Sequence, residues 1–262
     1  MVDEPFIVKR KILLRGAVLH IIDVEGLNES LKKLIEKHIT SIHSKGVLSD
    51  LAMVKSDLVQ RLKDPRDVPD KKIYMGLVAE FFAHLYLNYQ GFNQESLYIN
   101  MEDGGGMKKG FDGYYSIGGE DWLMESKSTI KESSKYHAEK VDEAYKDLNS
   151  KVSGKSITKK GRVKNPWLNA LMHAHVAKSE SDVVDRISKA NAEFSRGVYH
   201  SIAELNIVPT STIFLNVDWE ATDETEIEKV LNNWIEDKDF KKIQILSFTQ
   251  GSLDIFWEYL TS

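Results

Sequence analysis

The stretch Gly110-Phe111-Asp112-Gly113 and the segment Trp122-Leu123-Met124-Glu125-Ser126-Lys127 decide the fold expected for this chain. Between them lies the pair Gly118-Gly119, flanked by apolar and aromatic residues, and this pattern predicts a strand, a turn and a second strand. Successive side chains of a strand point to opposite faces, so Glu125 and Lys127 point the same way. The sequence therefore predicts a hairpin that holds a carboxylate and an ammonium side by side, with the aspartate of the first stretch ahead of it.

The segments on either side of this hairpin predict an α/β protein with a mixed sheet flanked by helices. Apolar residues recur at helical spacing on both sides of the hairpin, and shorter apolar runs indicate further strands. We expect helices over about residues 31–42, 48–62, 70–89, 134–149, 166–178, 181–197 and 224–237. We expect strands in residues 11–22, 97–100, 212–217 and 243–248. The expected organisation is a single domain over 1–262, with a catalytic core at 70–150, an N-terminal helical hairpin and a C-terminal α/β extension.

The composition excludes several classes of function. A net charge of -5 argues against a protein that coats nucleic acid by bulk charge, so contact with nucleic acid needs a local basic surface. The absence of cysteine excludes disulfides, thiolate zinc sites and a cysteine nucleophile, and it fits a cytoplasmic protein. Charges interrupt the apolar residues of 11–22, which suits two short strands better than a signal peptide or a membrane span.

The charges are distributed unevenly along the chain. Residues 223–239 contain seven acids against two lysines, whereas residues 151–164 contain six basic residues and no acid. This basic segment has several glycine and serine residues and no strong periodicity, so we expect a mobile loop or a disordered insertion. Two interpretations stay open, a clamp that neutralises phosphates and a solvated linker. Its cations are Lys151, Lys155, Lys159, Lys160, Arg162 and Lys164.

The two acids of the hairpin are the kind of ligand that magnesium prefers. Phosphodiester hydrolysis needs neutralised phosphate charge, an activated water and a stabilised leaving oxygen, and a divalent cation helps with all three. Magnesium keeps several waters and takes one or two carboxylates, so Asp112 and Glu125 suffice, with the main-chain carbonyl of Ser126 as a further ligand. We expect Lys127 to orient or deprotonate the attacking water and to stabilise phosphate charge. A nearby metal would lower the pKa of Lys127, and Mn²⁺ would be an alternative metal.

This arrangement over residues 70–149 resembles the PD-(D/E)xK nuclease superfamily. The resemblance rests on Asp112, on the triplet Glu125-Ser126-Lys127 and on Glu80, an acid in an upstream apolar helix. It implies a restriction-endonuclease-like core, magnesium on the first two acids, a lysine that acts on the nucleophilic water, and a helical acid that assists the metal or the water. Two features differ from the family: Phe111 replaces the proline before the aspartate, and a glutamine and tyrosine one turn apart are missing from the helix after the core.

Context separates the hairpin triplet from a second copy, Glu236-Asp237-Lys238. The second copy ends an acidic helical stretch without a preceding strand pair, so we expect solvated surface charges there. Glu80 has two interpretations, because a carboxylate in an apolar helix needs either a partner, such as the metal or Lys127, or a narrow solvated stripe. His84 lies one turn later, where a structural histidine is expected.

The chain is also similar to the HamA-like nuclease subunit of Hachiman antiphage defence systems, in its GFDG strand, its ESK strand and the lysine-rich helix that follows. This similarity implies a role in bacterial antiphage defence and a helicase partner. The expected function is magnesium-dependent hydrolysis of DNA, with Lys108 and Lys109 meeting the phosphate backbone. Two alternatives stay open: a non-catalytic nucleic-acid-binding or regulatory module on the same fold, and a nuclease that acts on RNA.

Overall fold

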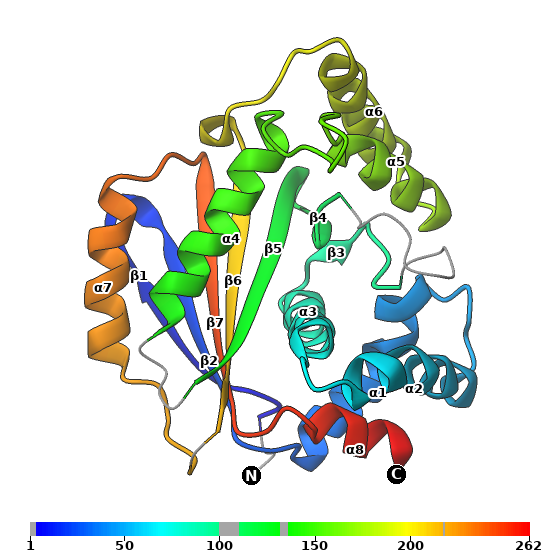
Figure 1. Cartoon of the computed structure of the whole chain (residues 1–262), viewed down its shortest axis with the longest axis vertical. Coiled ribbons are helices and arrows are strands. Elements are labelled where there is room, and N and C mark those ends of the chain that lie inside the picture. Colours follow the sequence, from blue (N-terminus) through cyan, green and yellow to red (C-terminus); the bar gives the residue numbers. More distant parts are fainter. Residues whose placement is uncertain (1–3, 100–109, 132–135, 217) are drawn as a thin grey trace.

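The chain forms a mixed seven-stranded sheet with helices on both faces (Figure 1). The structure is a computed structural model that describes residues 4–99, 110–131, 136–216 and 218–262. The strands are β1 (Ile7–Ile12), β2 (Val18–Val24), β3 (Asn93–Gln94), β4 (Gly113–Ile117), β5 (Glu120–Lys131), β6 (Asn206–Leu215) and β7 (Lys242–Gln250). The helices are α1 (Glu29–Ser44), α2 (Leu51–Asp67), α3 (Lys72–Tyr89), α4 (His137–Val152), α5 (Pro166–Val176), α6 (Ser181–Ser195), α7 (Glu224–Glu236) and α8 (Ile255–Thr261).

The centre of the sheet is parallel and its edges are antiparallel. The strand order is β1-β2-β7-β6-β5-β4-β3, and β2, β7, β6 and β5 run parallel to their neighbours in this group. β4 pairs with β5 over Gly113 to Ile117, and the last pair joins Gly113 to Met124. From Glu125 onward, no strand of the described residues covers that edge of β5. The main chain of β5 therefore has no strand partner on this side among the described residues, beside the predicted site.

Two apolar cores lie on opposite faces of the sheet. Helices α1, α2, α3 and α8 cover one face, and α4 and α7 cover the other (Figure 1). Met124 packs into the first core and Leu123 into the second. Because side chains alternate along β5, Glu125 and Lys127 share the face of Leu123 and lie under α4.

The predicted helices are all present in the structure, with ends that differ by a few residues. The strand expected at 97–100 is absent from residues 97–99, and residue 100 lies outside the described residues. The main chain there instead donates hydrogen bonds from Leu97 to His173 Nδ1 and from Tyr98 to the Ile42 carbonyl. β6 begins at Asn206, earlier than expected, because polar residues and Pro209 hide its strand pattern. The pairing of β6 with β7 skips Pro209, which has no N–H to donate.

The basic segment 151–164 is not an unstructured insertion. Lys151 belongs to α4, and the residues that follow fold back into a turn closed by an antiparallel bridge between Ile157 and Val163. The Thr158 N–H donates to the Arg162 carbonyl at 2.7 Å. We call residues 155–164 the basic turn. Among the described residues, no helix is long and apolar enough to cross a membrane.

Candidate active site

The predicted strand residues do meet at the uncovered edge of β5. Asp112 directly precedes β4, and its Oδ2 atom accepts a hydrogen bond of 2.9 Å from the main-chain N–H of Ser126. The N–H and C=O of one strand residue point to the same side, so the Ser126 carbonyl is also directed toward this edge. Asp112 is thus held beside Glu125 and Lys127, as the hairpin pattern predicts.

Helix α4 adds two charged residues to these three. Lys127 Nζ lies 2.9 Å from Glu125 Oε1 and 2.6 Å from Asp147 Oδ2. Lys151 Nζ lies 2.5 Å from Glu125 Oε2 and 3.6 Å from Asp147 Oδ2. The Glu125 side chain is 2% exposed, against 15% for Lys151, 28% for Lys127 and 35% for Asp147. We call these residues and Asp112 the charged cluster.

The electrostatics of the charged cluster follow from burial and proximity. Burial, and then the negative charge of Asp112, raise the pKa of Glu125 above its ordinary value, although both lysines act in the opposite direction. Burial opposes the charge of Lys127, but Glu125 and Asp147 outweigh it and raise the pKa of this lysine. Burial also opposes ionisation of Asp147, yet hydrogen bonding and the lysines hold its pKa well below the ordinary value. Without a metal, Lys127 is therefore an ammonium.

Helix α4 is fixed against the sheet, and this packing positions its two charged residues over β5. Its apolar stripe of Val141, Leu148 and Val152 is buried in the same core as Leu123. Its outer side is tied to α7, because the indole N–H of Trp234 donates to Asp142 Oδ1 at 2.9 Å. Asp147 and Lys151 lie one turn apart, so both reach the same point on β5.

Sequence reasoning missed these two residues as parts of the site. The sequence pattern ends the helix at Asn149 and so predicts Lys151 as a nucleic-acid-binding residue of a loop. The structure corrects the placement in a loop: Lys151 is in α4, is mostly buried and pairs with Glu125. Opposite charges at i and i+4 in the helix after the triplet are the signal that could have identified the pair.

Glu80 lies on a different element from the residues of the charged cluster. It lies on α3, which covers the face opposite to the one that bears Glu125 and Lys127. Its Oε1 atom is 3.4 Å from Nε2 of His84, a buried histidine that also bonds to the hydroxyl of Tyr115. After burial, the negative charges of Glu80 and then of Asp112 help to raise the pKa of Tyr115, so both acids act on the same hydroxyl. In the described residues Lys127 pairs with Glu125 and Asp147 and not with Glu80, whereas the role of Glu80 as a helical acid that assists the metal or the water stays a prediction. His84 is buried and hydrogen-bonded, as expected of a structural histidine.

The predicted nucleic-acid-binding cations fall into three groups. Lys155, Lys159, Lys160, Arg162 and Lys164 are exposed in the basic turn that follows α4. Lys151 is turned inward, as described above. Lys108 and Lys109 lie outside the described residues. The basic turn therefore begins just beyond the end of the helix that contributes to the charged cluster.

The acidic segment at 223–239 is used within the molecule. Glu224 lies 2.8 Å from Lys9 and 3.1 Å from Lys11, both on the edge strand β1. Glu236 and Asp237 are exposed at the end of α7, as expected for the second triplet, whereas its Lys238 is half-buried and lies 3.5 Å from Asp142. The acidic helix thus neutralises a basic edge strand on the far side of the sheet from β4.

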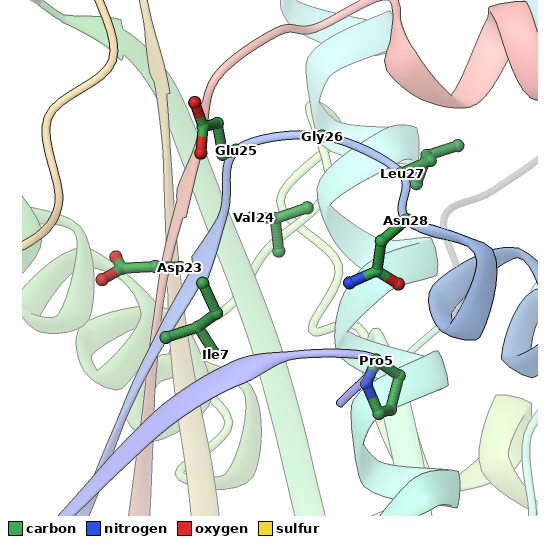
Figure 2. A pocket seen from close by; sticks show the side chains of 8 residues that line it. All are labelled: Pro5, Ile7, Asp23, Val24, Glu25, Gly26, Leu27 and Asn28. Atoms are coloured by element: carbon green, nitrogen blue, oxygen red, sulfur yellow. The ribbon is translucent and has the colours of Figure 1, made fainter. Parts of the chain in front are cut away.

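A pocket between β1 and the end of β2 carries no comparable chemistry. Figure 2 shows it lined by Pro5, Ile7 and residues 23–28, and β7 and β6 separate β2 from β5. The Asp23 side chain points away from Asn28 in this view, and it accepts a hydrogen bond of 2.9 Å from the Thr222 hydroxyl. Asn28 caps α1 by accepting from the Leu31 N–H at 2.8 Å. The side chains of Asp23 and Asn28 are thus already engaged within the fold.

The described residues contain no group of three or more histidine, aspartate or glutamate side chains arranged to hold a metal. The oxygen ligands on offer are the carboxylates of Asp112 and Glu125 and the carbonyl of Ser126. No protein-family model matches the sequence, and no curated protein matches it. The charged cluster is therefore the feature from which a function can be inferred.

Proposed function

We propose that this protein is a magnesium-dependent nuclease that hydrolyses DNA phosphodiester bonds on a restriction-endonuclease-like core. The supporting observation is the convergence of Asp112 and Glu125 at the uncovered edge of β5, with the Lys127 ammonium 2.9 Å from Glu125. Two acids and a lysine at one strand edge combine metal ligands with a cation for the phosphate.

The donor set suits magnesium. Asp112 is near enough to raise the pKa of the buried Glu125, and two carboxylates this close repel each other unless a cation lies between or beside them. Two carboxylates and the Ser126 carbonyl form the sparse oxygen site in which magnesium keeps several waters. When bound, the metal would neutralise phosphate charge and lower the pKa of a coordinated water.

In this proposal, Lys127 contacts the substrate and Asp147 positions Lys127. Lys127 is protonated in the metal-free cluster, and its ammonium would stabilise phosphate charge and orient the attacking water. Asp147, 2.6 Å from Lys127 Nζ, holds this ammonium in position. The exposed cations of the basic turn would contact the nucleic-acid backbone.

Cleavage of plasmid DNA tests this function. We expect wild-type protein to cleave in Mg²⁺ and not in EDTA, and Asp112→Asn, Glu125→Gln and Lys127→Met to reduce the rate at least about 100-fold. Glu236→Gln is the matched control, because it alters an exposed acid of the second triplet and should leave the rate unchanged. Unchanged cleavage by folded Glu125→Gln protein would show that this cluster is not an active site.

One observation favours the second candidate, a non-catalytic nucleic-acid-binding or regulatory module. Both oxygens of Glu125 are engaged by lysines, so the charged cluster is internally paired without a metal. In that case wild-type protein binds nucleic acid but cleaves none of a panel of linear, circular, single-stranded and structured DNA and RNA. The same panel distinguishes a deoxyribonuclease from a ribonuclease.

The biological setting in this proposal rests on the sequence similarity to HamA-like subunits. It places the nuclease in antiphage defence with a helicase partner. Loss of phage protection by the Glu125→Gln variant in a host that carries the intact system would support this setting.

A further inference from the structure

The pairing of Glu125 poses a problem for a metal ion at this site. Oε1 accepts from Lys127 at 2.9 Å and Oε2 accepts from Lys151 at 2.5 Å. A metal that takes Glu125 as a ligand needs one of these oxygens. Each oxygen keeps a second lone pair, but a divalent cation bound there would lie directly beside an ammonium group, so we expect one ammonium to move when the metal binds.

The geometry identifies Lys151 as the group that moves. Lys127 is held twice, by Glu125 and by Asp147 at 2.6 Å, and it lies on the same strand as Glu125. Lys151 has one short ion pair, because its distance to Asp147 is 3.6 Å. It also lies in the last turn of α4, next to the exposed cations of the basic turn, whereas Lys127 is in the middle of β5.

For electrostatic reasons, we expect either the Lys151 ammonium or the metal to lie beside Glu125, but not both. With Lys151 absent and no metal bound, the buried Glu125 and its neighbours Asp112 and Asp147 would have a single ammonium among them, which is costly. With both cations on Glu125, their mutual repulsion in a site of low dielectric would be large. The charges of the site are best matched when one further cation, either the Lys151 ammonium or the metal, accompanies Lys127.

We propose that Lys151 is an internal counter-ion of Glu125 that competes with the divalent metal for the same carboxylate, so that the site takes up metal only when this ammonium moves away. This inference rests on the proposed function, because it names the regulation of the same site. A displaced Lys151 ammonium would then lie beside the basic turn and contact substrate phosphate.

Metal affinity, measured without any cleavage, tests the inference. Mg²⁺ binding is followed by calorimetry, and Mn²⁺ binding by electron paramagnetic resonance, on the full chain. Removing the competitor in Lys151→Met should tighten both metals roughly 10- to 100-fold, because a charge-assisted hydrogen bond no longer opposes binding. Lys151→Arg keeps the competing charge and should stay within about threefold of wild type.

Two further variants control for side effects. Lys146→Met removes a lysine from the same helix whose side chain is 70% exposed and pairs with Asp142, so it should leave metal affinity unchanged. The double variant Glu125→Gln, Lys151→Met should lose the gain in affinity. If Lys151→Met is unstable in EDTA, its melting temperature should rise on adding Mg²⁺ by more than that of wild type, because metal binds the folded state.

The outcomes separate this inference from the proposed function. Affinity of Lys151→Met equal to or weaker than wild type, with binding abolished by Glu125→Gln, overturns the competition but leaves the metal site standing. Absence of metal binding in every variant at millimolar metal overturns both the competition and the metal-dependent function. A decrease in protein stability alone would not tighten metal binding. The higher metal affinity expected for Lys151→Met would therefore report the loss of the competing ammonium.

Discussion

Gly110 shows how a single residue in the GFDG stretch positions Asp112. A Cβ atom at this position would lie 2.2 Å from the carbonyl oxygen of Pro166, at the start of α5, so the two backbones are in direct contact. Phe111 follows and packs edge-on against Trp167, with ring centroids 5.1 Å apart. We expect Gly110→Ala to reduce the free energy of unfolding by about 1–3 kcal/mol, because the main chain must shift to relieve the overlap.

Urea unfolding measures this change, and Gly26→Ala is the control. No atom lies within 4 Å of a Cβ at Gly26, whose φ angle is not in the left-handed region, so its stability should change little. A Gly110→Ala protein as stable as wild type would mean that α5 and the GFDG stretch are not in contact in solution.

At the scale of elements, the hairpin can be predicted from the sequence because its signal is local. Alternation with period two fixes the shared face of Glu125 and Lys127, and the glycine pair fixes the turn. The direction of Glu80 cannot be read in the same way. Helix α3 is apolar on nearly all sides, so its pattern does not say which side faces the sheet or which face of the sheet it covers. The role of Asp147 also cannot be predicted from local sequence, because its partner Lys127 lies on a different element, β5.

The basic turn gives a prediction for one element. Its exposed cations should release counterions when they approach phosphates, and the salt dependence of DNA affinity reports how many do so. Replacing Lys155, Lys159 and Lys160 by glutamine should weaken DNA binding and reduce the slope of log affinity against log salt by up to about 2.7, roughly 0.9 for each phosphate that is no longer neutralised. Fluorescence anisotropy with a short duplex at several salt concentrations measures the slope.

The matched control for the basic turn removes the same charge elsewhere. Lys33, Lys37 and Lys63 are exposed on α1 and α2, which cover the other face of the sheet. Their triple glutamine variant has the same net charge as the basic-turn variant. Equal slopes for the two triple variants would show that DNA does not follow the basic turn.

For the whole molecule, a buried histidine under α4 links stability to pH. His137 is fully buried, and it hydrogen-bonds to the Ser211 hydroxyl at 2.7 Å and to the Thr249 hydroxyl at 3.0 Å. Burial lowers the pKa of His137 to about 3. The unfolded chain, in which histidine has a pKa of about 6.5, therefore binds a proton that the folded chain excludes, and stability falls as the pH drops below about 6.5.

Between pH 7 and pH 5, this one histidine should remove about 2 kcal/mol from the free energy of unfolding. His137→Gln keeps a hydrogen-bonding side chain without a titrating group. Between pH 7 and pH 5, we expect its free energy of unfolding to fall by about 2 kcal/mol less than that of wild type. Urea unfolding at pH 7, 6 and 5 measures both slopes. His175→Gln is the control, because it makes the same substitution at an exposed position of α5, away from α4. If His137→Gln and wild type had the same slope, His137 would be taking up its proton in the folded protein, and α4 would have to open over the sheet at mildly acidic pH to let it do so.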